Sequence, residues 1–142
     1  MNIQKEIIRL VKRYGTSNPF ELADYLSIIV IREPLGQIYG YHNYVYRQHF
    51  IHINSALDDI HARFTAAHEL GHVILHPAIN TSFLTRFTFI NGARIERQAN
   101  TFAVTLLCYG IEPVDGFTVR ETAAVYGIPR EYADMLQKCL FA

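Results

Sequence analysis

Apolar positions in the first 26 residues follow a helical period. Between Ile3 and Tyr14 they recur every three or four positions with lysine and arginine between them, which predicts a helix that Gly15 ends. Asn18 followed by Pro19 is the usual pairing of an N-cap with a first helical residue. A second, short helix is therefore expected to run to about residue 26.

The following segment has the composition of β-strands. Residues 28–31 form a short β-branched run, which indicates a buried strand. Residues 37–46 and 49–53 are rich in Tyr, Ile, Val and Phe, and predict two further strands. A hairpin tip at Arg47 and Gln48 is expected to join them, although the sequence lacks the Asn-Gly or Asp-Gly pair that favours a tight turn.

The second half of the chain returns to helical patterns. An unusually apolar helix is predicted over residues 57–76, before Pro77, and another over residues 93–109. Residues 78–92 have no clear period and contain no acidic residue, so they are expected to form a long loop. A short extended piece is expected within it, at residues 86–90.

A last pair of helices is predicted near the C-terminus. Thr118 and Glu121 form a capping box that opens the first of them, Gly127 closes it, and Pro129 starts the second. The pattern predicts one α+β domain over residues 1–142. Its expected parts are N-terminal helices (1–27), a small sheet (28–54), two long helices (57–76 and 93–109) and the C-terminal helix pair (118–141).

Composition and charge exclude several classes of protein. Of 142 residues, 50% are apolar and 18% charged, which fits neither a disordered tail nor an acidic solvating segment. Thirteen basic residues balance thirteen acidic ones, so no net charge attracts nucleic acid or an anionic membrane. No uninterrupted apolar run approaches the roughly 20 residues of a membrane helix or forms a signal-peptide core, so a cytoplasmic protein is expected. Cys108 and Cys139 are expected as buried thiols, with a single bridge between them as the alternative.

The most informative segment is a His-Glu-x-x-His motif, His68-Glu69-Leu70-Gly71-His72, in the first of the two long helices. Helix positions four apart differ by about 40° in azimuth and about 6 Å along the axis, so His68 and His72 can bind one tetrahedral ion. Glu69 points about 100° away from His68 and is suited to act as a general base. Gly71 is disfavoured inside a helix unless another backbone comes close. The alternative, two core histidines satisfied by hydrogen bonds, fits this apolar helix less well.

A catalytic zinc site needs a third protein ligand, and Glu96 is the candidate. Glu96 and Asn100 lie four residues apart on the helix expected at 93–109, so they share a face. Asn100 can accept a hydrogen bond from the outer nitrogen of a ligand histidine and fix its tautomer. The alternatives are a solvated Glu96 paired with Arg94 or Arg97, and Asn100 as a polar group between packed helices.

The other histidines carry weaker signals. His76 lies two turns beyond His68, about 12 Å along the helix axis, which is too far for a three-histidine site on one straight helix. It is therefore expected to be structural. His42, His52 and His61 are expected to be surface or strand residues.

Together, these motifs resemble those of the ImmA/IrrE metallopeptidases. The resemblance rests on His68-Glu-Leu-Gly-His72 followed by Leu75-His76, and on Glu96-x-x-Ala99-Asn100-x-Phe102-Ala103. It is extended by Ile51-His52-Ile53-Asn54, Arg63-Phe64 and Tyr126-Gly127-Ile128-Pro129, and spans roughly Gly36 to Leu140.

The resemblance implies a minimal thermolysin-like zincin fold, with a small antiparallel sheet, an active-site helix and a glutamate-bearing helix. It implies that His68, His72 and Glu96 bind Zn²⁺ and that Glu69 is the catalytic base. Asn100 stands where thermolysin-like enzymes usually carry Asp, so its role would be a neutral one. Family members of this size often come from phages and integrative elements. There they relieve repression by cleaving, or otherwise removing, a separate helix-turn-helix repressor.

Three other functions are disfavoured but stay open. A DNA-binding module at residues 118–140 would need more basic charge than its balanced residues supply. A non-proteolytic antirepressor or antitoxin-like binding protein, with a structural or degenerate metal site, would not need Glu69. Broad digestive proteolysis does not fit the expected cytoplasmic location.

No residue stands out as the donor that would stabilise the oxyanion of a peptidase reaction. Tyr39, Tyr41, Tyr46 and His49 lie on the expected hairpin and are candidates, although each is better explained as filling a face of the sheet. The exposed edge of this hairpin is a candidate for binding an extended substrate by strand addition.

Overall fold

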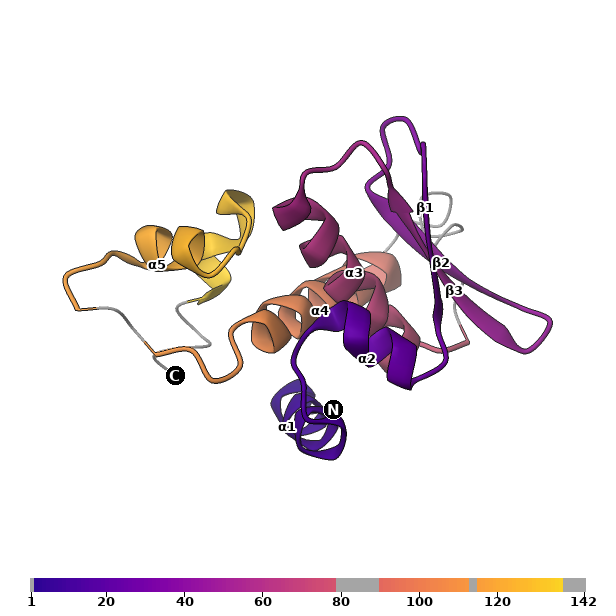
Figure 1. Ribbon diagram of the computed structural model, residues 1–142, viewed down its shortest axis with the longest axis horizontal. Helices are drawn as coiled ribbons and strands as arrows, with labels where there is room; N and C mark the ends of the chain where they lie inside the picture. The colour runs from indigo at the N-terminus through magenta and orange to yellow at the C-terminus, as the bar shows by residue number, and fades with distance from the viewer. Residues whose placement is uncertain (1, 79–89, 113–114, 137–142) are drawn as a thin grey trace.

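The computed structural model describes residues 2–78, 90–112 and 115–136 (Figure 1). A three-stranded sheet and two long helices form the centre, with α3 (Asp59–Leu75) between the sheet and α4 (Ile90–Leu107). The short helix α2 (Pro19–Tyr25) also packs on α3, and α1 (Ile3–Tyr14) packs on the other side of α4. The predicted α+β class is confirmed.

The N-terminal helices begin and end where their capping residues predict. Asn2 and Asn18 are the N-caps of α1 and α2, and accept hydrogen bonds from the backbone N–H groups of Lys5 (3.0 Å) and Phe20 (2.9 Å). Gly15 ends α1 in the left-handed region, at φ 72°, which glycine adopts without steric cost. Of these two helices, α1 packs on α4 and α2 packs on α3.

The sheet contains β1 (Ile29–Glu33), β2 (Gly40–Val45) and β3 (Gln48–Asn54), in the order β1-β3-β2. β2 and β3 pair antiparallel, whereas β1 and β3 pair parallel. The expectation of an antiparallel sheet is therefore wrong for β1, and the sheet is mixed. The chain reverses direction after β1 and again after β2. Since β3 lies between the two earlier strands, it runs in the same direction as β1.

The hairpin tip lies one residue earlier than expected, at Tyr46 and Arg47. Both residues have positive φ, 52° and 62°, the left-handed combination of a tight turn that matches the twist of the flanking strands. Gln48 instead begins β3, where it pairs with Val45, and its side-chain amide donates to the carbonyl of Ser27 at 2.6 Å. That long-range contact has no local signal in the sequence.

The two long helices pack closely around one glycine. A Cβ atom added to Gly71 of α3 would lie 3.0 Å from the Cβ, Cγ and Cδ1 atoms of Phe102 of α4. The close approach expected at Gly71 is therefore made by a side chain of α4, and Phe102 is fully buried there. α4 begins at Ile90, three residues before the expected start, and the rest of the extended piece expected at 86–90 lies outside the described residues.

The C-terminal part confirms the predicted capping box. Thr118 caps α5 (Val119–Val125), and the two reciprocal hydrogen bonds between Thr118 and Glu121 are present. The next helix opens with a 3₁₀ turn, η2 (Arg130–Tyr132), and is α-helical over 133–136.

Cys108 is buried and disulfide-bonded, so it is not the free thiol expected; Cys139 lies outside the described residues.

None of the helices in residues 2–78, 90–112 and 115–136 combines the length and hydropathy needed to span a bilayer.

His61 connects the first turn of α3 to the C-terminal part. Its Nδ1 lies 2.9 Å from Asp58, the N-cap of α3, and its Nε2 lies 2.9 Å from Glu131 of η2. One turn later, the rings of Phe64 and Tyr132 stack with centroids 4.1 Å apart. The hydrogen bond to Asp58, reinforced by Glu131, raises the pKa of His61 despite some loss of hydration.

Replacing His61 by Gln is expected to destabilise the fold at low pH only. A pKa raised by folding stabilises the protein fully below the unfolded pKa of about 6.5, and that stabilisation is lost as the pH rises through the folded pKa. Urea unfolding of wild type and His61→Gln, with a chelator in every sample, should show a gap at pH 5.5 that closes at pH 8.5. The gap should be small, because both carboxylates are largely exposed. An equal gap at both pH values would contradict the ion-pair explanation.

Candidate metal centre

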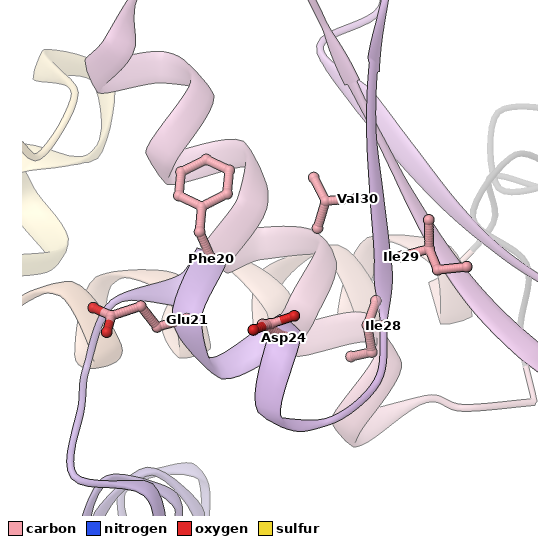
Figure 2. A pocket seen from close by; sticks show the side chains of 6 residues that line it. All are labelled: Phe20, Glu21, Asp24, Ile28, Ile29 and Val30. Atoms are coloured by element: carbon pink, nitrogen blue, oxygen red, sulfur yellow. The ribbon is translucent and has the colours of Figure 1, made fainter.

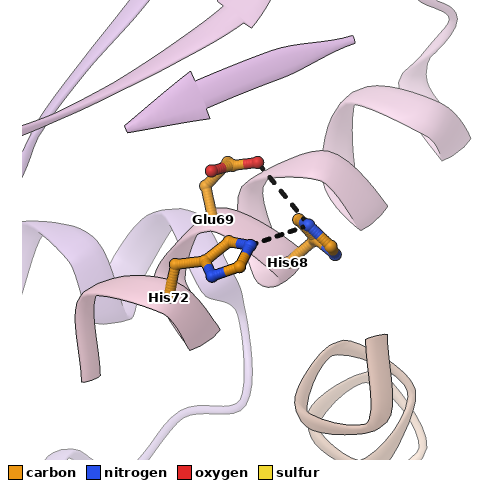
Figure 3. A group of neighbouring side chains, drawn as sticks. All are labelled: His68, Glu69 and His72. Atoms are coloured by element: carbon orange, nitrogen blue, oxygen red, sulfur yellow. Dashed lines mark hydrogen bonds and ion pairs between the residues drawn. The ribbon is translucent and has the colours of Figure 1, made fainter. Parts of the chain in front are cut away.

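α3 and α4 bring three potential metal ligands together. His68 and His72 lie one turn apart on α3, with their Nε2 atoms 3.2 Å apart (Figure 3). Glu96 of α4 reaches both rings: one carboxylate oxygen lies 3.1 Å from Nε2 of His68, and the other lies 2.9 Å from Nε2 of His72. The three residues singled out by helical spacing are therefore neighbours in space.

This set of donor atoms fits a divalent metal ion. Two imidazoles and a carboxylate are a ligand set of catalytic zinc sites, with bonds of about 2.0–2.2 Å. The ligand atoms around a tetrahedral ion of that size are about 3.3–3.6 Å apart. The separations of 2.9, 3.1 and 3.2 Å are only slightly shorter, so a small outward movement of the side chains would admit an ion.

Asn100 contacts the far side of His68. Its Oδ1 lies 2.7 Å from Nδ1 of His68. An amide oxygen can only accept, so Nδ1 carries a proton, and in a neutral His68 ring Nε2 is then the nitrogen free to bind a metal on the side of His72 and Glu96. The structure therefore places Asn100 against the outer nitrogen of His68, where the sequence analysis expects it.

Glu69 lies beside the two imidazoles but on a different side of α3. One of its oxygens is 3.7 Å from Nε2 of His68, and the other is 3.8 Å from Nδ1 of His42 on β2. Figure 3 shows the carboxylate on the side of α3 that faces the strands. One ligand atom from each of His68, Glu69 and His72 lies within 4.8 Å of the others, so this His-Glu-His group can hold a metal ion.

The charges in this cluster compensate one another. Burial by itself raises the pKa of Glu69, but the interactions with His42, His68 and His72 outweigh it, and the pKa is lowered overall. Burial also opposes charge on Glu96 and His68. Interactions with His68 and His72 nonetheless lower the pKa of Glu96 well below its usual range, and those with Glu96 and Glu69 raise the pKa of His68. Both carboxylates are therefore ionised at neutral pH and offer negative charge to a cation.

His42 is a site residue that the sequence analysis missed. It lies on β2, as one of the two readings expected, but it is fully buried and not at the surface. Its ring stacks on that of His72, with centroids 5.8 Å apart and planes 20° apart. Alternation along β2 places His42 on one face of the sheet. Only the packing of α3 on the sheet shows that this face is the buried one. Position 42 therefore had no local signal of its role.

Comparisons with known proteins agree with this geometry. The IrrE N-terminal-like domain (Peptidase_M78) matches residues 23–108, which include α3 and α4. The chain belongs to the ImmA/IrrE family. "Uncharacterized immunity region protein 2" of Bacillus phage phi105 is 40% identical over 138 residues, covering 94% of this chain and 87% of that protein. "Metallopeptidase ImmA" of Bacillus subtilis (strain 168) is 31% identical over 140 residues, covering 93% of this chain and 82% of that protein.

The hairpin of this ImmA/IrrE family member presents one of the four oxyanion candidates on the face that contacts α3. His49 shares that face with His42, and the two ring centroids are 6.3 Å apart. Tyr41 stacks on His52 on the opposite face, and Tyr46 at the tip is 97% exposed. The remaining candidate, Tyr39, meets the edge of His61. Of the four candidates, His49 is therefore the one on the face of the sheet that carries His42 and contacts α3.

His76 contacts His72 of the candidate metal centre. It is the C-cap of α3, and its backbone N–H donates to the carbonyl of His72 at 2.7 Å. Its ring also lies against that of His72, with Nδ1 3.4 Å from Nδ1 of His72. The expectation that His76 lies too far along the helix to bind the same ion as His68 is consistent with this position.

Two cavities of this family member lie away from the ligands. One, of about 520 Å³, lies at α2 and β1 and is lined by Phe20, Glu21, Asp24, Ile28, Ile29 and Val30 (Figure 2). The other, of about 470 Å³, lies between the start of α3 and α5. Its lining includes Arg120 and Arg130 together with Asp58 and Glu121, so its charges balance and do not favour phosphate binding.

Proposed function

We propose that this chain is a zinc-dependent metallopeptidase of regulatory type. The observation that carries the proposal is the convergence of His68, His72 and Glu96 beside a buried, ionised Glu69. His68, His72 and Glu96 would hold Zn²⁺, and Asn100 would fix the tautomer of His68. When bound, Zn²⁺ would supply Lewis acidity toward the scissile carbonyl and lower the pKa of the attacking water.

Glu69 is proposed as the general base. Its carboxylate is ionised at neutral pH and lies beside His68 and His72, 3.7 Å from Nε2 of His68. It would accept a proton from the attacking water and transfer it to the nitrogen of the leaving amine. The opposite oxygen of Glu69 lies 3.8 Å from Nδ1 of His42, so a charged or polar ring on β2 faces the carboxylate from the sheet.

The proposed substrate is a separate helix-turn-helix repressor of a phage or mobile element. Two observations support this: one relative is named an immunity region protein of a phage, and another is named a metallopeptidase. The partner is then a protein rather than DNA or a membrane, and the location is the cytoplasm, where such repressors act. The alternative, a non-proteolytic antirepressor or antitoxin-like protein with a structural or degenerate metal site, gives Glu69 no role.

Metal content of the purified chain tests the ligand set. Wild type is expected to contain about one zinc per chain, and so is Glu69→Gln, because Glu69 lies outside the ligand set. His72→Ala is expected to contain none, because the ion loses one of three protein ligands. Elemental analysis after dialysis against a weak chelator measures all three.

His52→Ala is the matched control, since His52 lies on the opposite face of the sheet and pairs with Glu33 at 2.8 Å. It should keep its zinc. Zinc retained by His72→Ala would contradict the assigned ligands. Incubation of wild type with a helix-turn-helix repressor encoded beside its gene then tests cleavage, and binding without cleavage would favour the alternative function.

A further inference from the structure

A chain of two hydrogen bonds leads from α4 to the second proposed ligand, His72. The Oε1 atom of Gln98 lies 2.7 Å from Nε2 of His76. The Nδ1 atom of His76 lies 3.4 Å from Nδ1 of His72, and the two ring centroids are 5.5 Å apart. The mechanism proposed above uses neither His76 nor Gln98.

The chemistry of these groups sets the direction of both hydrogen bonds. The amide oxygen of Gln98 can only accept, so Nε2 of His76 donates. A neutral His76 protonated on Nε2 has a bare Nδ1, which accepts the proton of Nδ1 of His72. In a neutral His72 ring, Nε2 is then the nitrogen left to bind a metal on the side of His68 and Glu96, which is the tautomer that a metal requires.

We propose that His76 and Gln98 form a positioning relay that fixes the tautomer and the ring orientation of His72 for metal binding. The proposal rests on the proposed function, because it takes His72 to be a metal ligand. His72 is fully buried, so water does not supply an acceptor for its Nδ1–H group. The relay supplies an acceptor for the outer nitrogen of His72, as Asn100 does for the outer nitrogen of His68.

The arrangement also explains why one segment of α4 is so rich in polar side chains. Glu96, Gln98 and Asn100 are alternate residues: the first contacts both Nε2 atoms, and the other two reach the outer sides of the two imidazoles, Gln98 through His76. One short stretch of helix therefore supplies a ligand and orients the other two. Groups that orient metal-binding histidines are typically worth about 10–100-fold in metal affinity.

Metal affinity, and not activity, tests the relay. Co²⁺ is titrated into the metal-free full chain in competition with a chromophoric chelator, and the visible absorption of bound Co²⁺ reports the ligand geometry. His76→Leu removes the acceptor at similar side-chain volume, and we expect it to weaken Co²⁺ binding about 10–100-fold. His76→Asn places an amide oxygen near the position of Nδ1, so affinity and spectrum should return to within a few-fold of wild type. Gln98→Leu should be weakened and Gln98→Glu should not.

The backbone hydrogen bond of His76 is unchanged in each of these variants, so a loss of affinity reports the side chain. Thermal unfolding of the metal-free proteins checks that all of them fold. His76→Leu binding as tightly as wild type would overturn the relay and leave the metal centre standing. Equal weakening in His76→Leu and His76→Asn would also overturn it, since the acceptor would not be what matters. Failure of wild type itself to bind Co²⁺ or Zn²⁺ would overturn the proposed function, and the relay with it.

Discussion

Replacing Glu69 by Gln is expected to reduce peptide hydrolysis by roughly three orders of magnitude while leaving the metal in place. General-base catalysis is worth about 10²–10⁴-fold in rate. An amide of the same shape cannot accept the proton of the attacking water, so that contribution is lost. The proposed ligands His68, His72 and Glu96 contact one another at 2.9–3.2 Å, whereas Glu69 comes no nearer to His68 than 3.7 Å, so the affinity for metal should not fall. Single-turnover cleavage of the repressor, with zinc content measured on the same samples, separates the two quantities.

Glu33→Gln is the matched control for this substitution. Glu33 also pairs with a histidine, His52 at 2.8 Å, but on the opposite face of the sheet from α3. It should cleave at the wild-type rate. A Glu69→Gln protein that contains zinc and still cleaves at more than about a tenth of the wild-type rate would contradict the assignment of Glu69 as the base. A Glu69→Gln protein that loses its zinc would instead place Glu69 among the ligands.

The part of the site that could be predicted from the sequence is the part set by one helix. His68 and His72 are neighbours because four residues make about one helical turn, which holds in any α-helix. The same rule placed Glu96 and Asn100 on one face of α4, although only packing could show that this face meets His68. Local geometry thus supplied the candidates, and tertiary structure brought them together.

The part that could not be predicted depends on long-range order. Position 42 alternates correctly for a strand, but the sequence does not state that β2 crosses α3 next to Glu69. The parallel pairing of β1 with β3 has no local signal either, because no turn joins the two strands. His76 was excluded as a ligand by distance along the helix, yet its ring contacts His72 because it sits just beyond the last turn of α3.

Gly40 allows β2 to lie close to both β3 and α3. A Cβ atom at this position would lie 2.5 Å from the backbone oxygen of His52 and 2.7 Å from Cγ2 of Thr65 on α3. Both distances are shorter than side-chain carbons tolerate, and the nearer partner is backbone in the central strand of the sheet. Glycine is therefore required here for close approach rather than for an unusual φ.

Gly40→Ala is expected to destabilise the fold by about 2–3 kcal/mol, the upper range for forcing an extra methyl group into a packed interior. Gly36→Ala is the control, because Gly36 has open space around it and its φ of 62° costs only about 1–2 kcal/mol. Urea unfolding of the metal-free proteins compares the two. Relief of the contact with Thr65 moves β2 away from α3, and with it His42 away from Glu69. Cleavage by the folded Gly40→Ala protein should therefore fall although its zinc content does not. If Gly40→Ala were as stable as Gly36→Ala and fully active, the close contact between β2 and α3 would not be what positions Glu69.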